Sequence, residues 1–135
     1  MSRTLVPPFP GRITGASGLV LGAAAVVSPI IDTWQCNFVS WEGLVTGTSA
    51  GALTIEGSNQ YDPVAALNAL YTVPTFVQMP ATTPALPVLA GAGLSFGVTS
   101  PGPGGGGGGM RYQRMRHAGG AGAGVLHLWI CGVGP

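Results

Sequence analysis

Glycine and proline occur throughout this chain, and they limit it to short secondary-structure elements. The 135 residues include 24 glycines and 12 prolines. Glycine adds conformational entropy that a regular element must remove, and proline lacks the backbone donor that a helix or sheet interior needs. Only residues 64–71 have the pattern of a helical turn, with Asp62 and Pro63 as the cap and first-turn proline. The composition therefore favours strands, turns and extended segments.

Alternating apolar residues predict strands along most of the chain. In the stretch 32–63, two strands are expected on either side of a turn at 46–51. Apolar residues alternate from Trp34 to Phe38 and then shift by one position, which predicts a bulge or burial of both faces. The second strand places Leu53 and Ile55 on one face. Further strands or extended apolar segments are expected at 18–27, 75–79, 86–89, 94–99, 110–117 and 125–131.

Strands at this density predict an all-β fold, a β-sandwich or jelly roll of about seven or eight strands. We expect a single sandwich domain at 18–135, preceded by an extended arm at 1–17. The polyglycine segment 104–109 is expected in an exposed hairpin loop, because it has no side chain to bury. Trp41 or Trp129 should complete the core or lie at an interface. The other predicted core residues are Trp34, Phe38, Leu53, Ile55, Leu126, Leu128 and Ile130.

The first residues favour an arm over a targeting signal. Val6–Pro10 is rich in proline and favours polyproline geometry, which leaves backbone groups available to a neighbouring surface. Arg3 and Arg12 precede the apolar run 18–27, which keeps a signal peptide open as the alternative. Prolines interrupt that charged region, and the run is shorter than the roughly 20 residues that span a bilayer.

Charged residues are unusually rare. Five arginines, no lysine and four acids make 7% of the chain, whereas soluble domains average about 25%. A surface this poor in charge is weakly protected against association, so we expect a homo-oligomer with much of its surface covered. The net charge of +1 attracts neither nucleic acid nor anionic membrane, and neither is expected as a partner.

The basic cluster consists of Arg111, Arg114 and Arg116. Nucleic-acid binding would require more cations and exposed aromatic platforms. The three arginines are instead expected to pair with acids of the same chain or of a neighbouring subunit. The candidate acids in the chain are Asp32, Glu42, Glu56 and Asp62.

Several motifs resemble active sites, but each has a structural explanation. Gly47–Gly51 matches the G-x-S-x-G nucleophile pattern, yet a strand-like segment follows it where a helix is required, so Ser49 is expected in a hairpin turn. Gly119–Gly124 is followed by a strand and not by a phosphate-binding helix. No catalytic residue and no cofactor are predicted.

The two histidines and two cysteines lack the short ligand spacings of a zinc site. His127 is therefore expected as a core or interface histidine, and no metal is predicted. Cys36 and Cys131 could form one disulfide, but each sits in an apolar pattern, which favours free buried thiols. The second histidine considered as a zinc ligand is His117.

Two parts of the chain carry a family resemblance. Trp41–Gly43, the turn Gly47–Gly51 and the segment 53–59 resemble small β-sandwich virion proteins of tailed bacteriophages, in which a Gly-rich turn leads into a strand ending in a Gly-Ser-Asn turn. Residues 110–131 look like the final hairpin of those proteins, an arginine-bearing strand paired with a closing apolar strand.

The resemblance implies a non-enzymatic capsid cement or decoration protein on the phage head surface of the virion, with the major capsid protein as its partner. The expected interface residues are Val6, Pro7, Pro8, Phe9, Pro10, Phe76, Met79, Leu86, Arg111, Arg114 and Arg116. The alternative is a fibre or tail accessory module that binds a receptor or carbohydrate. Its stacking surface would consist of Trp34, Trp41, Tyr61 and Tyr71.

Overall fold

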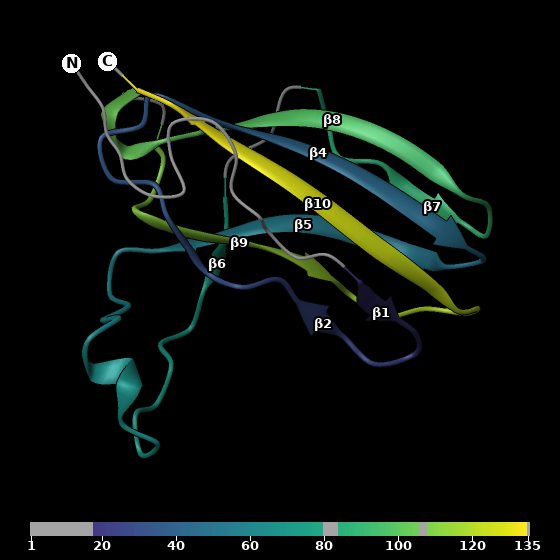
Figure 1. Ribbon diagram of the computed structural model, residues 1–135, viewed down its shortest axis with the longest axis horizontal. Helices are drawn as coiled ribbons and strands as arrows, with labels where there is room; N and C mark the ends of the chain where they lie inside the picture. Colours follow the sequence, from purple (N-terminus) through teal and green to yellow (C-terminus); the bar gives the residue numbers. More distant parts are fainter. Residues whose placement is uncertain (1–17, 80–83, 106–107, 135) are drawn as a thin grey trace.

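The computed structural model describes residues 18–79, 84–105 and 108–134. This part of the chain is all-β and contains no α-helix, as the sequence predicted (Figure 1). Its elements are β1 (Leu19–Leu21), β2 (Val26–Val27), β3 (Ile31–Asp32), β4 (Phe38–Gly47), β5 (Ala50–Ser58), η1 (Ala65–Leu67), β6 (Val77–Gln78), β7 (Val88–Ala90), β8 (Leu94–Pro101), η2 (Pro103–Gly105), β9 (Tyr112–His117) and β10 (Gly124–Val133). The η elements are single 3₁₀ turns.

The strands form two antiparallel sheets. The four-stranded sheet has the order β1-β10-β4-β8. In the six-stranded sheet β9 pairs with β5, both β2 and β3 pair with β9, and both β6 and β7 pair with β5. Since β2 with β3 and β6 with β7 each fill one strand position, both sheets have four positions, in the order of a jelly roll. The predicted fold class is confirmed.

Successive long strands lie in opposite sheets, so the connections between them cross the sandwich (Figure 1). β4 leads into β5, β8 into β9 and β9 into β10, each time with a change of sheet. The hairpins predicted at Gly47–Gly51 and between the last two strands are therefore wrong. Both connections are corners, and the long strands pair with neighbours that are distant in sequence, as β10 does with β1 and β4.

The buried face of β4 is formed by the apolar residues that follow the one-position shift in the alternating pattern. Val39, Trp41 and Val45 point inward and are fully buried. The indole N–H of Trp41 donates to Ser100 Oγ at 2.9 Å, and that hydroxyl donates to Gln113 Oε1 at 2.8 Å, so one hydrogen-bonded chain joins the two sheets. Other predicted core residues are also buried. These are Leu53, Ile55, Leu126, Leu128 and Ile130.

Two predicted core residues lie outside it. Trp34 is 50% exposed and Phe38 is 41% exposed. The residues before Phe38 form a turn between β3 and β4 and not the start of a strand: Gln35 has φ 65°, and Cys36 N–H donates to Thr33 O at 3.0 Å. Because the turn rotates the chain, the apparent alternation from Trp34 to Phe38 has no structural counterpart.

The strands on either side of the glycine-rich segment, β8 and β9, lie in different sheets, so the hairpin predicted there is not formed. Residues 106–107 of the segment lie outside the described residues. Gly102 is buried, and its N–H donates to Asn37 O at 2.9 Å. Gly104 N–H donates to Cys36 O at 2.9 Å. A Cβ at Gly102 would collide with Cys36 O, which explains why glycine is required there.

Other predictions concern the ends and edges of the fold. The proline-punctuated segments 75–79 and 86–89, expected as strands or extended segments, supply the short strands β6 and β7 at the edge of the six-stranded sheet. The helical turn expected over 64–71 is the single 3₁₀ turn η1. The predicted arm 1–17 lies outside the described residues. Among the residues that are described, no apolar helix reaches membrane-spanning length.

Candidate interaction surface

Three arginines lie on β9 or directly before it, and each is paired within the chain. Arg111 donates from Nε and Nη2 to the two carboxylate oxygens of Asp32, both at 3.0 Å. Arg114 Nε donates to Glu56 Oε1 at 3.0 Å, and Arg116 Nε lies 3.9 Å from Glu56 Oε2. The prediction that this cluster pairs with acids of the chain is confirmed. A role for the three arginines toward a partner stays a prediction.

Aromatic rings cover two of these cations. The Arg111 guanidinium lies 5.0 Å from the ring centroids of both Trp34 and Tyr112, and that of Arg114 lies 4.1 Å from Phe76. The hydrogen bond with Asp32 raises the pKa of Arg111, while burial raises the pKa of Tyr112. The indole that was expected to stack on a carbohydrate is therefore occupied by an arginine.

An edge-to-face aromatic cluster anchors the loop 59–76 to the six-stranded sheet. Tyr61 lies at its centre, with ring centroids 5.2 Å from Tyr112, 6.1 Å from Tyr71 and 6.2 Å from Phe76. Tyr61 and Tyr71 come from the two limbs of the loop, and Tyr112 belongs to β9. The cluster therefore holds the limbs together at their base. Trp41, the other residue expected in a stacking surface, is in the core.

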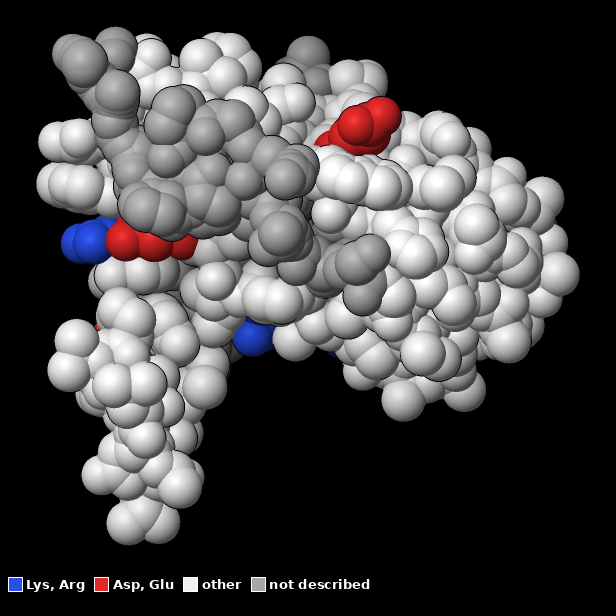
Figure 2. All heavy atoms as spheres, in the orientation of Figure 1, with Lys and Arg blue, Asp and Glu red and all other residues white. Residues whose placement is uncertain are grey.

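The loop projects away from the sandwich (Figures 1 and 2), and it carries three strongly exposed apolar side chains. Val64 is 76% exposed, Leu67 is 87% exposed and Leu70 is 89% exposed. We call these three residues the apolar tip. Figure 2 shows no charged side chain at the outer end of the projection. The three residues of the apolar tip are spaced three apart in the sequence, and this spacing is the signal that could have revealed a shared surface. From the sequence alone, the segment is interpreted only as a helical turn.

Hydrogen bonds fix the shape of this loop. Asp62 Oδ1 accepts from Val64 N–H at 2.9 Å and from Ala65 N–H at 3.0 Å. Asp62 N–H donates to the Tyr71 hydroxyl at 3.0 Å, and Tyr71 N–H donates to Asn68 O at 3.0 Å. The apolar tip is therefore presented by an internally bonded loop, and its exposure follows from that structure.

Some predicted interface residues are used within the chain itself. Phe76 and Met79 are buried, and Met79 belongs to the core, so they have almost no surface to offer a partner. Leu86 is half-buried against the core. Burial argues against interface roles for Phe76 and Met79, and the interface role of Leu86 stays a prediction. Val6–Pro10 lies outside the described residues, and its interface role stays a prediction.

The geometry around Ser49 does not resemble a nucleophile site. The side chain is buried, and Ser49 Oγ has no hydrogen-bond partner among the described residues. The nearby His117 is occupied by backbone groups: Nε2 donates to Ala50 O at 2.8 Å, and Nδ1 accepts from Gly119 N–H at 3.3 Å. No base is therefore aligned with the hydroxyl in this part of the molecule.

The thiols and potential metal ligands are dispersed. Cys36 and Cys131 are both free, and Cys36 is buried as predicted, whereas Cys131 is only half-buried. Burial raises the pKa of Cys36 to about 11, with a smaller contribution from Asp32. Within the described ranges, no group of three or more His, Cys, Asp or Glu side chains is arranged to hold a metal ion.

Comparison of the chain with protein-family models, with curated proteins and with solved structures finds no match. The resemblance to phage virion proteins therefore stays a prediction from the sequence. The function has to be inferred from the surfaces described above, of which the apolar tip is the most exposed.

Proposed function

We propose that this chain is a non-enzymatic structural protein of the virion, a cement or decoration protein that bridges neighbouring capsid subunits on a phage head. The observation that carries the proposal is the apolar tip. Leu67 and Leu70 are almost fully exposed on a loop whose base is fastened to the sheet. An apolar patch that the fold presents in this way marks a contact with another protein.

The energetics of the tip suit a stable attachment. Burying one Leu side chain contributes about 1.5–3 kcal/mol. Because hydrogen bonds already fix the loop, little conformational entropy is lost when it docks. The tip therefore suits an apolar crevice between shell subunits.

The distribution of charge supports the same kind of partner. Asp32 and Glu56 are the partners of all three described arginines, so two of the three positive charges are offset within the chain. Contacts with the major capsid protein should then depend on apolar surface and extended backbone. A homo-oligomeric arrangement on the shell would cover further charge-poor surface.

The test is a double substitution at the apolar tip, Leu67→Ser with Leu70→Ser. The variant is co-expressed with the major capsid protein of the same genome. We expect shell attachment to weaken at least about tenfold, while the melting temperature of the free protein stays unchanged. Val88→Thr in β7 is the matched control, because Val88 is 70% exposed on another part of the surface. Full attachment of the double variant would refute the role of the tip.

Two further experiments distinguish a cement protein from a fibre or tail module. Deleting residues 1–11 should weaken attachment without unfolding the sandwich. Raising salt from about 0.05 to 0.5 M shortens the screening length from roughly 14 to 4 Å, and attachment should hardly change. Release of folded protein by moderate salt would instead favour the receptor-binding alternative.

A further inference from the structure

The outer face of the four-stranded sheet presents a second set of groups, which the proposed cement role does not use. Across the middle of this sheet, Trp129 of β10 lies opposite Glu42 of β4, which lies opposite Gly97 of β8. All three point away from the core, since their neighbours along each strand are the inward-facing residues. An indole, a carboxylate and a position without a side chain therefore form one row.

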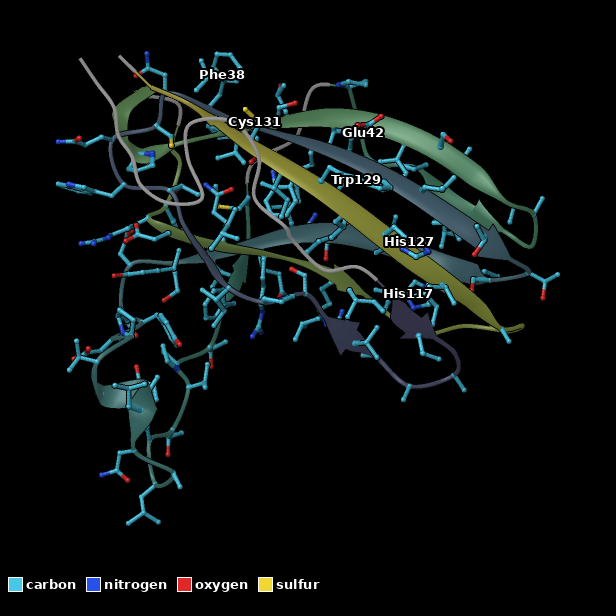
Figure 3. The ribbon with its side chains drawn as sticks, in the orientation of Figure 1. Phe38, Glu42, His117, His127, Trp129 and Cys131 are labelled. Atoms are coloured by element: carbon cyan, nitrogen blue, oxygen red, sulfur yellow. The ribbon has the colours of Figure 1, made fainter. Side chains whose placement is uncertain are left out.

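The aromatic end of this row is flat and accessible. Trp129 is 41% exposed, although tryptophan side chains are on average mostly buried. The His127 ring lies nearly parallel to it, with ring centroids 6.3 Å apart and an interplanar angle of 28°. Figure 3 shows both side chains along β10, with Glu42 on the adjoining strand. The exposed part of the Trp129 indole offers an apolar face on which a ring-shaped ligand can stack.

The other end of the row lies in a shallow groove of mixed character. It has a volume of about 590 Å³, and Glu42 and Gly97 line it together with hydroxyl-bearing and apolar residues, namely Ser40, Ser95, Thr99, Trp41, Pro84, Phe96 and Val98. A Cβ built on Gly97 would meet nothing closer than 3.9 Å, so the missing side chain leaves open space in the groove. Among the described residues, the Glu42 carboxylate forms neither a hydrogen bond nor an ion pair. Its four acceptor positions remain available.

These groups together select the chemistry of a ligand. An anion would be repelled by Glu42, and the described arginines lie on or next to β9 in the other sheet. A purely aliphatic ligand would leave the Glu42 carboxylate unsatisfied. A pyranose ring has an apolar C–H face that can stack on an indole and a rim of hydroxyl groups that can donate to a carboxylate.

We propose that the row Trp129–Glu42–Gly97 is a saccharide-binding site. One neutral sugar ring stacks on Trp129, adjacent hydroxyl groups of the sugar donate to Glu42, and the next part of the glycan occupies the groove at Gly97. A shallow single site of this kind should bind with a Kd on the order of 1 mM. Copies displayed together on a particle would bind a glycan-coated surface more tightly through avidity.

The experiment titrates the full chain with trisaccharides of glucose, galactose and mannose, followed by NMR of the three tryptophan indole N–H groups. At least one trisaccharide should shift the Trp129 signal and leave that of the buried Trp41 in place. No shift with any of them up to about 20 mM, well above the expected Kd, would overturn the proposal. Choline is titrated as a cationic probe, because a carboxylate beside an indole also attracts cations. Tighter binding of choline than of every sugar would likewise overturn it.

Three variants test the roles of the row. Trp129→Ala should weaken sugar binding at least about tenfold, and Glu42→Gln about fivefold. Gly97→Val fills the groove in a β-compatible way and should weaken binding about tenfold without unfolding the sheet. Trp34→Ala removes a half-exposed indole elsewhere and should leave binding unchanged. Wild-type affinity in Trp129→Ala or in Gly97→Val would refute the site, and shell attachment of these variants reports separately on the cement role.

Discussion

The two outer faces of the sandwich use their charged and aromatic side chains in opposite ways. On the six-stranded sheet, Arg114 lies between the Glu56 carboxylate and the Phe76 ring, so each group satisfies another. On the four-stranded sheet, Glu42 and Trp129 lie side by side and remain exposed to solvent. The charged groups of the first face are paired by its own residues, and this face supports the projecting loop, whereas the second face leaves Glu42 and Trp129 available.

The largest changes in the free energy of unfolding should come from substitutions in the core, to which both sheets contribute buried apolar residues. Ile55 faces inward from the six-stranded sheet and Leu128 from the four-stranded sheet, and both are buried. Ile55→Ala and Leu128→Ala should each lower the free energy of unfolding by about 2–5 kcal/mol in urea denaturation. A cost below about 1 kcal/mol for only one of them would show that the sheets also differ on their inner sides.

An intermediate effect should separate the two carboxylates. Glu56 is largely buried and accepts from Arg114, so Glu56→Ala leaves a partly buried guanidinium without its acceptor. We expect it to lower the free energy of unfolding by about 1–3 kcal/mol. Glu42→Ala should change that free energy by less than about 0.5 kcal/mol. Equal costs in thermal or urea unfolding would contradict the contrast between the faces.

The smallest effect concerns the thiols. Burial raises the pKa of Cys36 from 9.0 to about 11, so the folded state favours its neutral thiol. The resulting stability is intact below pH 9 and is lost as the pH rises toward 11. Cys36→Ala should make this loss smaller. At pH 8, Ellman's reagent should react with the half-buried Cys131 before it reacts with the buried Cys36. The reverse order would mean that the Cys36 thiol is more accessible to solvent than its burial indicates.

Local patterns predicted the parts of this fold that depend on local properties. The alternation of Leu53 and Ile55 identified the inward side of β5, because a strand with one buried face must alternate. The scarcity of acids made the partners of the arginine cluster predictable. Asp62 was correctly expected to cap the turn that follows it.

Features that depend on distant parts of the chain were not predictable in this way. Trp34 appeared to continue a strand, but the turn there involves Thr33, whose one hydroxyl hydrogen is within reach of the carbonyls of both Met110 and Arg111. A glycine-rich turn has the same local signal in a hairpin as in a corner, because sheet pairing decides between them. For the same reason, the row Trp129–Glu42–Gly97 becomes visible only when β10, β4 and β8 are aligned.

The position of β10 has a consequence for synthesis. It is the last of the described strands, yet it lies between β1 and β4 and forms the central contacts of its sheet. A nascent chain that has not reached Gly124 therefore has a gap in the middle of the sheet and two unpaired strand edges, and it is open to aggregation. We expect the sandwich to close only after this strand leaves the ribosome, so that premature termination yields an unfolded product and not a shortened native one.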